Sequence, residues 1–151
     1  MGLYVDCRIC RMIEKILSIL ITITRHSCSI GLTDHVVVTG GSWLSNVLAT
    51  KYNLDGWMED LPALNDGRQN HACAWYRDDA GTLVYLVTGG WRWEDPQPLS
   101  STEILSSGSP QWSFTSPLPY SISGLSAVTV DNIPFLFGNI IAFMQFNIQD
   151  V

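Results

Sequence analysis

The chain has 151 residues, of which 46% are hydrophobic and 15% charged, and its formal net charge is -6. This composition excludes an intrinsically disordered chain, and the length fits about one ordinary domain. The 12 acidic and 4 basic residues of positions 26–151 argue against nucleic acids and anionic membrane surfaces as partners, so a charged partner is expected to be basic.

The first segment, residues 1–24, is predicted to form an amphipathic helix. From Arg8 to Leu20 the apolar residues recur at spacings of three and four, which is the helical period. The longest apolar or hydroxylic run, 16–24, is far shorter than the about 20 residues of a membrane span. Glu14 and Arg25 argue against a signal peptide, which favours a cytoplasmic location over secretion. The helix either packs on the following domain or is foreign to it.

The cysteines are interpreted as buried free thiols. There are 4 of them, too few and too scattered for a disulfide scaffold in a chain of this length. Cys7 and Cys10 form a C-x-x-C pair, but their spacing to His26 and Cys28 matches no common zinc site. The fourth, Cys73, stands alone. We therefore expect neither a metal nor another cofactor.

A repeat organises residues 25–151. An apolar run ends in Gly40-Gly41, a second ends 49 residues later in Gly89-Gly90, and a third ends another 49 residues later in Gly138-Asn139. Glycine, asparagine and aspartate between the apolar runs predict tight turns, and thus four short strands per period. An antiparallel four-stranded sheet repeated at this spacing is typical of a β-propeller blade.

Downstream of each glycine pair, the first two units share a tryptophan and a Leu-Pro dipeptide. Trp57 and Leu61-Pro62 follow the first pair, Trp112 and Leu118-Pro119 the second. Together with Tyr52 and Arg68, these residues resemble the kelch repeat over positions 25–151. The resemblance implies an all-β fold, an incomplete kelch-type β-propeller with repeats at 36–83 and 84–132 and an incomplete unit at 133–151. Its motif positions are Gly40, Gly41, Tyr52, Trp57, Arg68, Gly89, Gly90, Trp112 and Gly138.

The motif residues are expected to be structural. Trp57 and Trp112 recur at blade spacing, so both are predicted to pack in the core between sheets. By the same resemblance, Arg68 braces neighbouring blades. The glycines need no ligand, because close strand approach and positive φ explain them.

Candidate binding residues lie in the loops that follow the glycine pairs. The second unit carries six more residues than the first between its glycines and its tryptophan, and the excess must project from the sheet. In a four-stranded meander, this loop lies at the same end of the sheet as the loops at 42–47, 64–70 and 120–123. Loops on a rigid scaffold bind partners through tryptophan, tyrosine and arginine. The candidates are Trp43, Trp91, Arg92, Trp93 and Tyr120.

The function predicted from these features is a non-catalytic protein-interaction module that binds an unidentified protein. No serine or cysteine lies in a nucleophile context, and the three histidines are dispersed. The alternatives are a fragment of a propeller enzyme, galactose-oxidase-like or a hydrolase, and a truncated product without a function of its own. Because propellers close at roughly four to eight blades, we also expect the chain to aggregate or to pair with a second chain.

Overall fold

The computed structural model describes residues 26–41, 47–92, 94, 97–138 and 144–145, and every regular element among them is a β-strand. Sheet 1 contains β1 (Cys28–Gly31), β2 (His35–Thr39), β3 (Ala49–Asn53) and β4 (Met58–Asp60). Sheet 2 contains β5 (Ala72–Arg77), β6 (Leu83–Thr88), β7 (Thr102–Ser106) and β8 (Ser113–Thr115). Sheet 3 contains β9 (Ser126–Val130), β10 (Ile133–Phe137) and β11 (Met144–Gln145).

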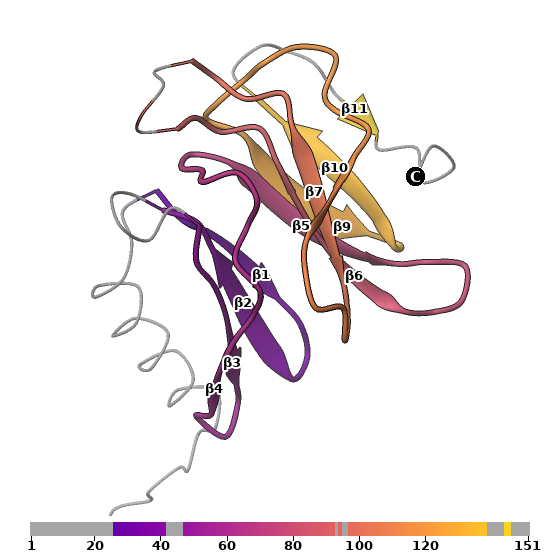
Figure 1. Cartoon of the computed structure of the whole chain (residues 1–151). Coiled ribbons are helices and arrows are strands. Elements are labelled where there is room, and N and C mark those ends of the chain that lie inside the picture. Colours follow the sequence, from indigo (N-terminus) through magenta and orange to yellow (C-terminus); the bar gives the residue numbers. More distant parts are fainter. Residues whose placement is uncertain (1–25, 42–46, 93, 95–96, 139–143, 146–151) are drawn as a thin grey trace, which may run out of the picture.

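In each sheet, every strand pairs antiparallel with the next strand along the chain. The three sheets follow one another in chain order, with β5 between β1 and β9 (Figure 1). The predicted all-β class with four-stranded antiparallel units is confirmed. The predicted helix at 1–24 lies outside the described residues, and no helix in the described part is long and apolar enough to cross a membrane.

The sheets are out of phase with the sequence repeat by one strand. The repeat at 36–83 leaves out β1 and includes β5, which belongs to sheet 2, and the repeat at 84–132 includes β9, which belongs to sheet 3. The reason is the short turn after β1, in which Leu32 N–H donates to His35 C=O. This turn leads directly into β2, so β1 and β2 belong to the same sheet. The glycine-ended strand is therefore the second strand of each sheet.

β2 and β6 each end at a glycine pair. At both pairs the chain turns sharply and passes close to the backbone of another segment. Gly40 and Gly89 have φ of 60° and 63°, a region that favours glycine. A Cβ at Gly40 would lie 2.4 Å from the carbonyl oxygen of Arg68, and one at Gly89 would lie 2.7 Å from that of Ile122. Both the turn and the close approach exclude a side chain.

The core lies between successive sheets, which stack face to face. We call the side of a sheet that packs on the next sheet its forward face and the opposite side its rear face. Ile30, Val37 and Ala49 on the forward face of sheet 1 pack in one cluster with residues on the rear face of sheet 2, which include Cys73, Tyr85, Val87 and Leu105. Between sheets 2 and 3, Thr129 Oγ1 accepts from Trp75 N–H and donates to Trp75 C=O.

Cys28 and Cys73 form a disulfide bond, so the interpretation of these two cysteines as free thiols is wrong, whereas Cys7 and Cys10 lie outside the described residues. Cys28 of β1 and Cys73 of β5 are bonded, with their Cα atoms 5.9 Å apart. They are 45 residues apart in sequence. They meet because the stacking of sheet 1 on sheet 2 places β1 beside β5, which no sequence spacing indicates.

The prediction that both motif tryptophans are core residues is wrong for Trp57. Trp112 is 2% exposed and donates its indole N–H to Pro62 C=O at 2.8 Å, whereas Trp57 is 75% exposed. The strand register explains the difference. Trp112 lies opposite Leu105, but the counterpart of Leu105 in β3, Tyr52, pairs with Met58. A shift of one residue turns a side chain to the other face, so Met58 occupies the position that corresponds to Trp112.

Candidate functional site

The predicted binding loops gather at one end of the sheets, which we call the glycine end. Gly41 N–H donates to Arg68 C=O at 3.0 Å, and Gly90 N–H donates to Ile122 C=O at 2.9 Å. Trp91 and Gln69 exchange two backbone hydrogen bonds of 3.0 and 3.1 Å. The connections between sheets are thus fastened to the segments that follow the glycine pairs.

A buried ion pair lies next to the glycine end and bonds to the backbone there. Arg68 Nη2 donates to Glu103 Oε1 at 2.6 Å, and neither side chain is exposed to solvent. The guanidinium also donates to the carbonyl oxygens of Gly89 and Ser101, each at 3.0 Å. Glu103 in turn accepts from the backbone N–H groups of Asn65 at 2.7 Å and Asp66 at 3.0 Å. A buried charge is tolerated only with such partners.

The surroundings of Arg68 lower the pKa of its guanidinium without removing its charge. Burial lowers the pKa of its guanidinium, and the adjacent Glu103 carboxylate opposes that effect. Arginine remains protonated in proteins because its ordinary pKa is so high. Arg68 is therefore a fixed cation that joins the connection after sheet 1 to the end of β6 and to β7 of sheet 2.

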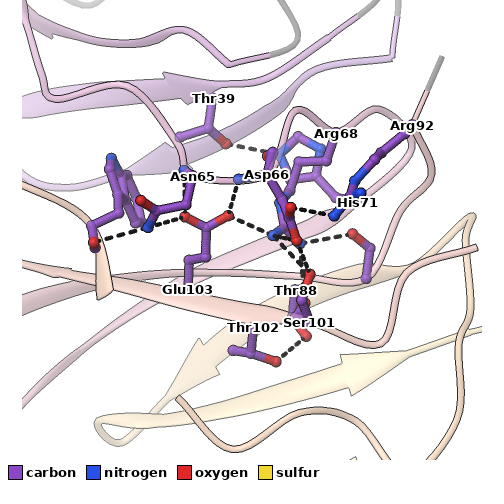
Figure 2. A network of polar contacts seen from close by, with 12 residues as sticks. Thr39, Asn65, Asp66, Arg68, His71, Thr88, Arg92, Ser101, Thr102 and Glu103 are labelled. Carbon is purple, nitrogen blue, oxygen red and sulfur yellow. Dashed lines mark hydrogen bonds and ion pairs between the residues drawn. The ribbon is translucent and has the colours of Figure 1, made fainter. Parts of the chain in front are cut away.

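Asp66 links this buried pair to the surface. Its carboxylate accepts from Ser101 Oγ at 2.7 Å and lies 3.8 Å from Arg68 Nη2. It also forms an ion pair with Arg92, whose side chain is 38% exposed. Figure 2 shows these carboxylates and guanidinium groups as one connected network. Arg92 is thus a charged member of the network that reaches solvent.

His71 fills the space beneath the first glycine pair. Its Nε2 lies 2.9 Å from Thr39 Oγ1 in a hydrogen bond, while its Nδ1 is buried without a hydrogen-bond partner (Figure 2). Burial lowers the pKa of His71 to about 3, and the nearby charge of Arg68 adds to the effect. The ring is neutral at neutral pH, so it is a packing group in the folded chain.

The second sheet-to-sheet connection replaces these polar residues with apolar ones. A Cβ at Gly40 would meet the His71 ring, and a Cβ at Gly89 would meet Leu125, so Leu125 occupies the position of His71. By the backbone bonds to the glycine pairs, Ile122 occupies the position of Arg68. The ionic network therefore belongs to the first connection only.

The structure places three of the five predicted binding residues at the glycine end. Trp91 and Arg92 follow the second glycine pair, with half-buried side chains, and Tyr120 is exposed on the connection to sheet 3. Trp43 and Trp93 lie outside the described residues. In the part of the chain that the structure describes, no group of three or more histidine, cysteine, aspartate or glutamate side chains could hold a metal ion.

Sequence reasoning missed Asp66, Ser101 and Glu103. One signal was present for Glu103, since it is the single acid inside the strand Thr102–Ser106. An acid within an apolar strand indicates a buried partner, and Arg68 is a suitable one. Asp66 and Ser101 lie in polar loops, where no comparable signal distinguishes them.

Comparison with known proteins gives a structural likeness. No family model matches the chain, and no curated protein matches it. Among solved structures, 102 chains match, including that of YjhT with a TM-score of 0.60 and 8% sequence identity. The match covers 82% of this chain and 46% of the YjhT chain, so this chain spans about half of YjhT. At this identity the match shows a shared fold alone, and the kelch resemblance stays a prediction.

Proposed function

We propose that the chain is part of a kelch-type β-propeller and acts as a non-catalytic protein-interaction module that binds through its glycine end. The stacked antiparallel sheets support the propeller arrangement. In each of the two complete sheets the glycine pair follows the second strand, which is what a repeated blade requires.

The observation that carries the binding role is the anchoring of Arg92 on the buried network. Its partner Asp66 is held by Ser101 and lies near the fixed charge of Arg68, so the guanidinium of Arg92 has a defined position although it reaches solvent. A surface group that is already ordered loses little conformational entropy on binding. Arginine, tryptophan and tyrosine are the residues that most often carry binding energy at protein interfaces.

The backbone around these residues is equally fixed. Trp91 is bonded to Gln69, and Ile122, two residues after Tyr120, donates its N–H to Leu99 C=O at 3.0 Å. Two connections and the loop between β6 and β7 thus form one surface. We propose that Trp91, Arg92 and Tyr120 contact the partner protein together, with Trp43 and Trp93 as further candidates.

Affinity capture with matched arginine variants tests this function. The immobilised chain would be used to capture proteins from an extract of its source, and captured proteins would be compared between Arg92→Ala, Tyr120→Ala and Arg77→Ala. Arg77 is an exposed arginine at the opposite end of sheet 2, where it bonds to Gly81 C=O. We expect binding of a captured partner to weaken about tenfold or more for the first two variants, as at an interface hot spot.

The control variants make the result decisive. Arg77→Ala should bind the partner as the unchanged chain does, and circular dichroism should show that all three variants are folded. Equal binding by Arg92→Ala, Tyr120→Ala and the unchanged chain would refute the glycine end as the contact surface.

A further inference from the structure

The rear face of sheet 1 is buried along its middle and exposed at its margins. Val38 of β2 and Tyr52 of β3, which belong to the two central strands, are each 8% exposed. On the same face, Met58 of β4 is 64% exposed, and Ser29 of β1 and Asp60 of β4 are exposed as well. A cover therefore lies over the two central strands and leaves the two edge strands open.

None of the described strands supplies this cover. Sheet 1 packs on sheet 2 through its forward face, and Val38 and Tyr52 belong to none of the apolar clusters that the described residues form. An uncovered face differs clearly in the same molecule. Phe137 of β10, on the face of sheet 3 turned away from sheet 2, is 43% exposed although β10 has a neighbouring strand on each side. The cover of sheet 1 thus belongs to a part of the chain outside the described residues.

Position in the chain indicates the segment before β1 as the cover. Residues 42–46 join β2 to β3 at the glycine end, whereas Tyr52 lies near the other end of β3. The remaining segments adjoin sheets 2 and 3, which lie on the forward side of sheet 1: 93 and 95–96 lie between β6 and β7, and 139–143 and 146–151 flank β11. Residues 1–25, in contrast, lead directly into sheet 1.

The sequence of residues 8–20 has the pattern that such a cover requires. Its apolar side chains recur at spacings of three and four and form one stripe on a helix: Ile9, Met12, Ile13, Ile16, Leu17 and Leu20. A helix is about 10–12 Å wide and neighbouring strands lie about 4.8 Å apart, so one helix covers two strands. At about 1.5 Å per residue, a helix over 8–20 extends about 20 Å, which matches the length of about 17 Å expected for a strand such as β3.

The charges of the two surfaces are complementary. Arg8, Arg11 and Lys15 recur at the helical spacings and lie along one side of the apolar stripe. Asp60 is exposed at the margin of the rear face, near Tyr52. Burial raises the pKa of the Tyr52 hydroxyl, and the Asp60 carboxylate adds to this rise. A face that is apolar at its centre and acidic at its margin fits a segment that is basic beside an apolar stripe.

We propose that residues 8–20 form an amphipathic helix that packs on the rear face of sheet 1 and covers Val38 and Tyr52. The helix then has the place on sheet 1 that sheet 1 has on sheet 2, and it shields this apolar face from water. Stacked repeats need such a cover with a polar outer side to remain soluble. The inference requires neither the kelch assignment nor partner binding at the glycine end, so it can hold or fail independently of the proposed function.

Nitration of tyrosines by tetranitromethane, followed by mass spectrometry of the peptides, tests this contact in the full chain. In the unchanged chain, Tyr120, which is 50% exposed, should be nitrated, whereas Tyr52 should be protected. Ile13→Asp and Ile16→Asp should each displace the segment, because an unpaired charge cannot be buried against Val38 and Tyr52. The nitration of Tyr52 should then rise toward that of Tyr120.

Ser18→Asp is the matched control, because Ser18 lies opposite the apolar stripe and the added charge is the same. It should leave Tyr52 protected. The buried Tyr76 and Tyr85 report unfolding, and Ile16→Ala, which adds no charge, is used in place of any aspartate variant in which they are nitrated.

Three results would overturn the proposal. One is the nitration of Tyr52 in the unchanged chain to the level of Tyr120. Another is a protected Tyr52 in folded chains that carry a substitution at Ile13 or Ile16. The last is a Tyr52 that Trp43→Ala uncovers and the variants of 8–20 do not, which would assign the cover to 42–46.

Discussion

At the residue scale, the first connection between sheets combines a buried ion pair with a buried neutral histidine. Arg68 and Glu103 satisfy each other and the surrounding backbone, whereas His71 leaves one ring nitrogen without a hydrogen-bond partner. The second connection has Ile122 and Leu125 at the positions of Arg68 and His71. The same backbone turn is thus built once with polar and once with apolar side chains, which indicates that the polar set is not needed for the turn itself.

Replacing His71 by leucine should flatten the dependence of stability on pH. Burial holds the pKa of His71 at about 3 in the folded chain, below the roughly 6.5 of an exposed histidine. Between these values the unfolded chain binds a proton that the folded chain does not, so this contribution to stability is complete above about pH 6.5 and is lost as the pH falls toward 3. The contribution of His71 to the free energy of unfolding changes by at most about 1.4 kcal/mol per pH unit.

Urea unfolding of the unchanged chain and His71→Leu from pH 7 to pH 4 measures this slope. The leucine variant should lose less stability over the range, because Leu125 shows that the equivalent site accepts leucine. His26→Asn, at an exposed histidine, is the control and should follow the unchanged chain. Parallel pH profiles for the unchanged chain and His71→Leu would contradict the expectation.

Breaking the buried ion pair should cost far more than breaking an exposed one. Arg68→Met leaves Glu103 buried without its cation, and Glu103→Gln leaves Arg68 without its anion. Each variant should lower the free energy of unfolding by about 3–5 kcal/mol. The double variant should lose less than the sum of the two. Lys51 and Glu59, 3.2 Å apart at the surface, are the matched control, and Lys51→Met should cost about 1 kcal/mol or less. Denaturant unfolding would measure each value, and equal losses at the two pairs would be the contrary result.

At the element scale, the first two sheets are joined covalently as well as by packing. The Cys28–Cys73 bond links β1 to β5, and Cys28 lies on the same face of sheet 1 as Ile30 and Val37. Disulfides form and persist mainly in oxidising compartments. We therefore expect the chain to mature in such a compartment, against the cytoplasmic location that its first 25 residues favour.

Loss of the disulfide should destabilise the contact between sheets 1 and 2. Cys28→Ser and Cys73→Ser should each lower the free energy of unfolding by about 2–5 kcal/mol, because the bond closes a long loop of the unfolded chain. A reducing agent should have the same effect on the unchanged chain and none on either variant. Mass spectrometry after alkylation under denaturing, non-reducing conditions checks the bond itself. Alkylation of both residues in the unreduced chain would show that the bond does not form.

At the scale of the whole molecule, the three sheets stack in chain order, and backbone hydrogen bonds between the connections order one end of the stack, the glycine end. The face of sheet 3 that is turned away from sheet 2 is exposed at Val128, whereas the rear face of sheet 1 is exposed at Met58 but buried at Val38 and Tyr52. The ordered end carries Arg92 on its buried support.

The sequence by itself determined the class of fold and the position of the candidate end. Apolar runs, glycine pairs and turn residues are local signals, and they predicted antiparallel strands and the gathering of Trp91, Arg92 and Tyr120. Only the tertiary structure decided which residues of different strands and sheets contact one another. Trp57 is exposed because the register of β4 is shifted by one residue, Cys28 reaches Cys73 because sheet 1 stacks on sheet 2, and Glu103 pairs with Arg68 for the same reason. Such contacts depend on the register and stacking of strands far apart in the chain, which no local pattern of residues records.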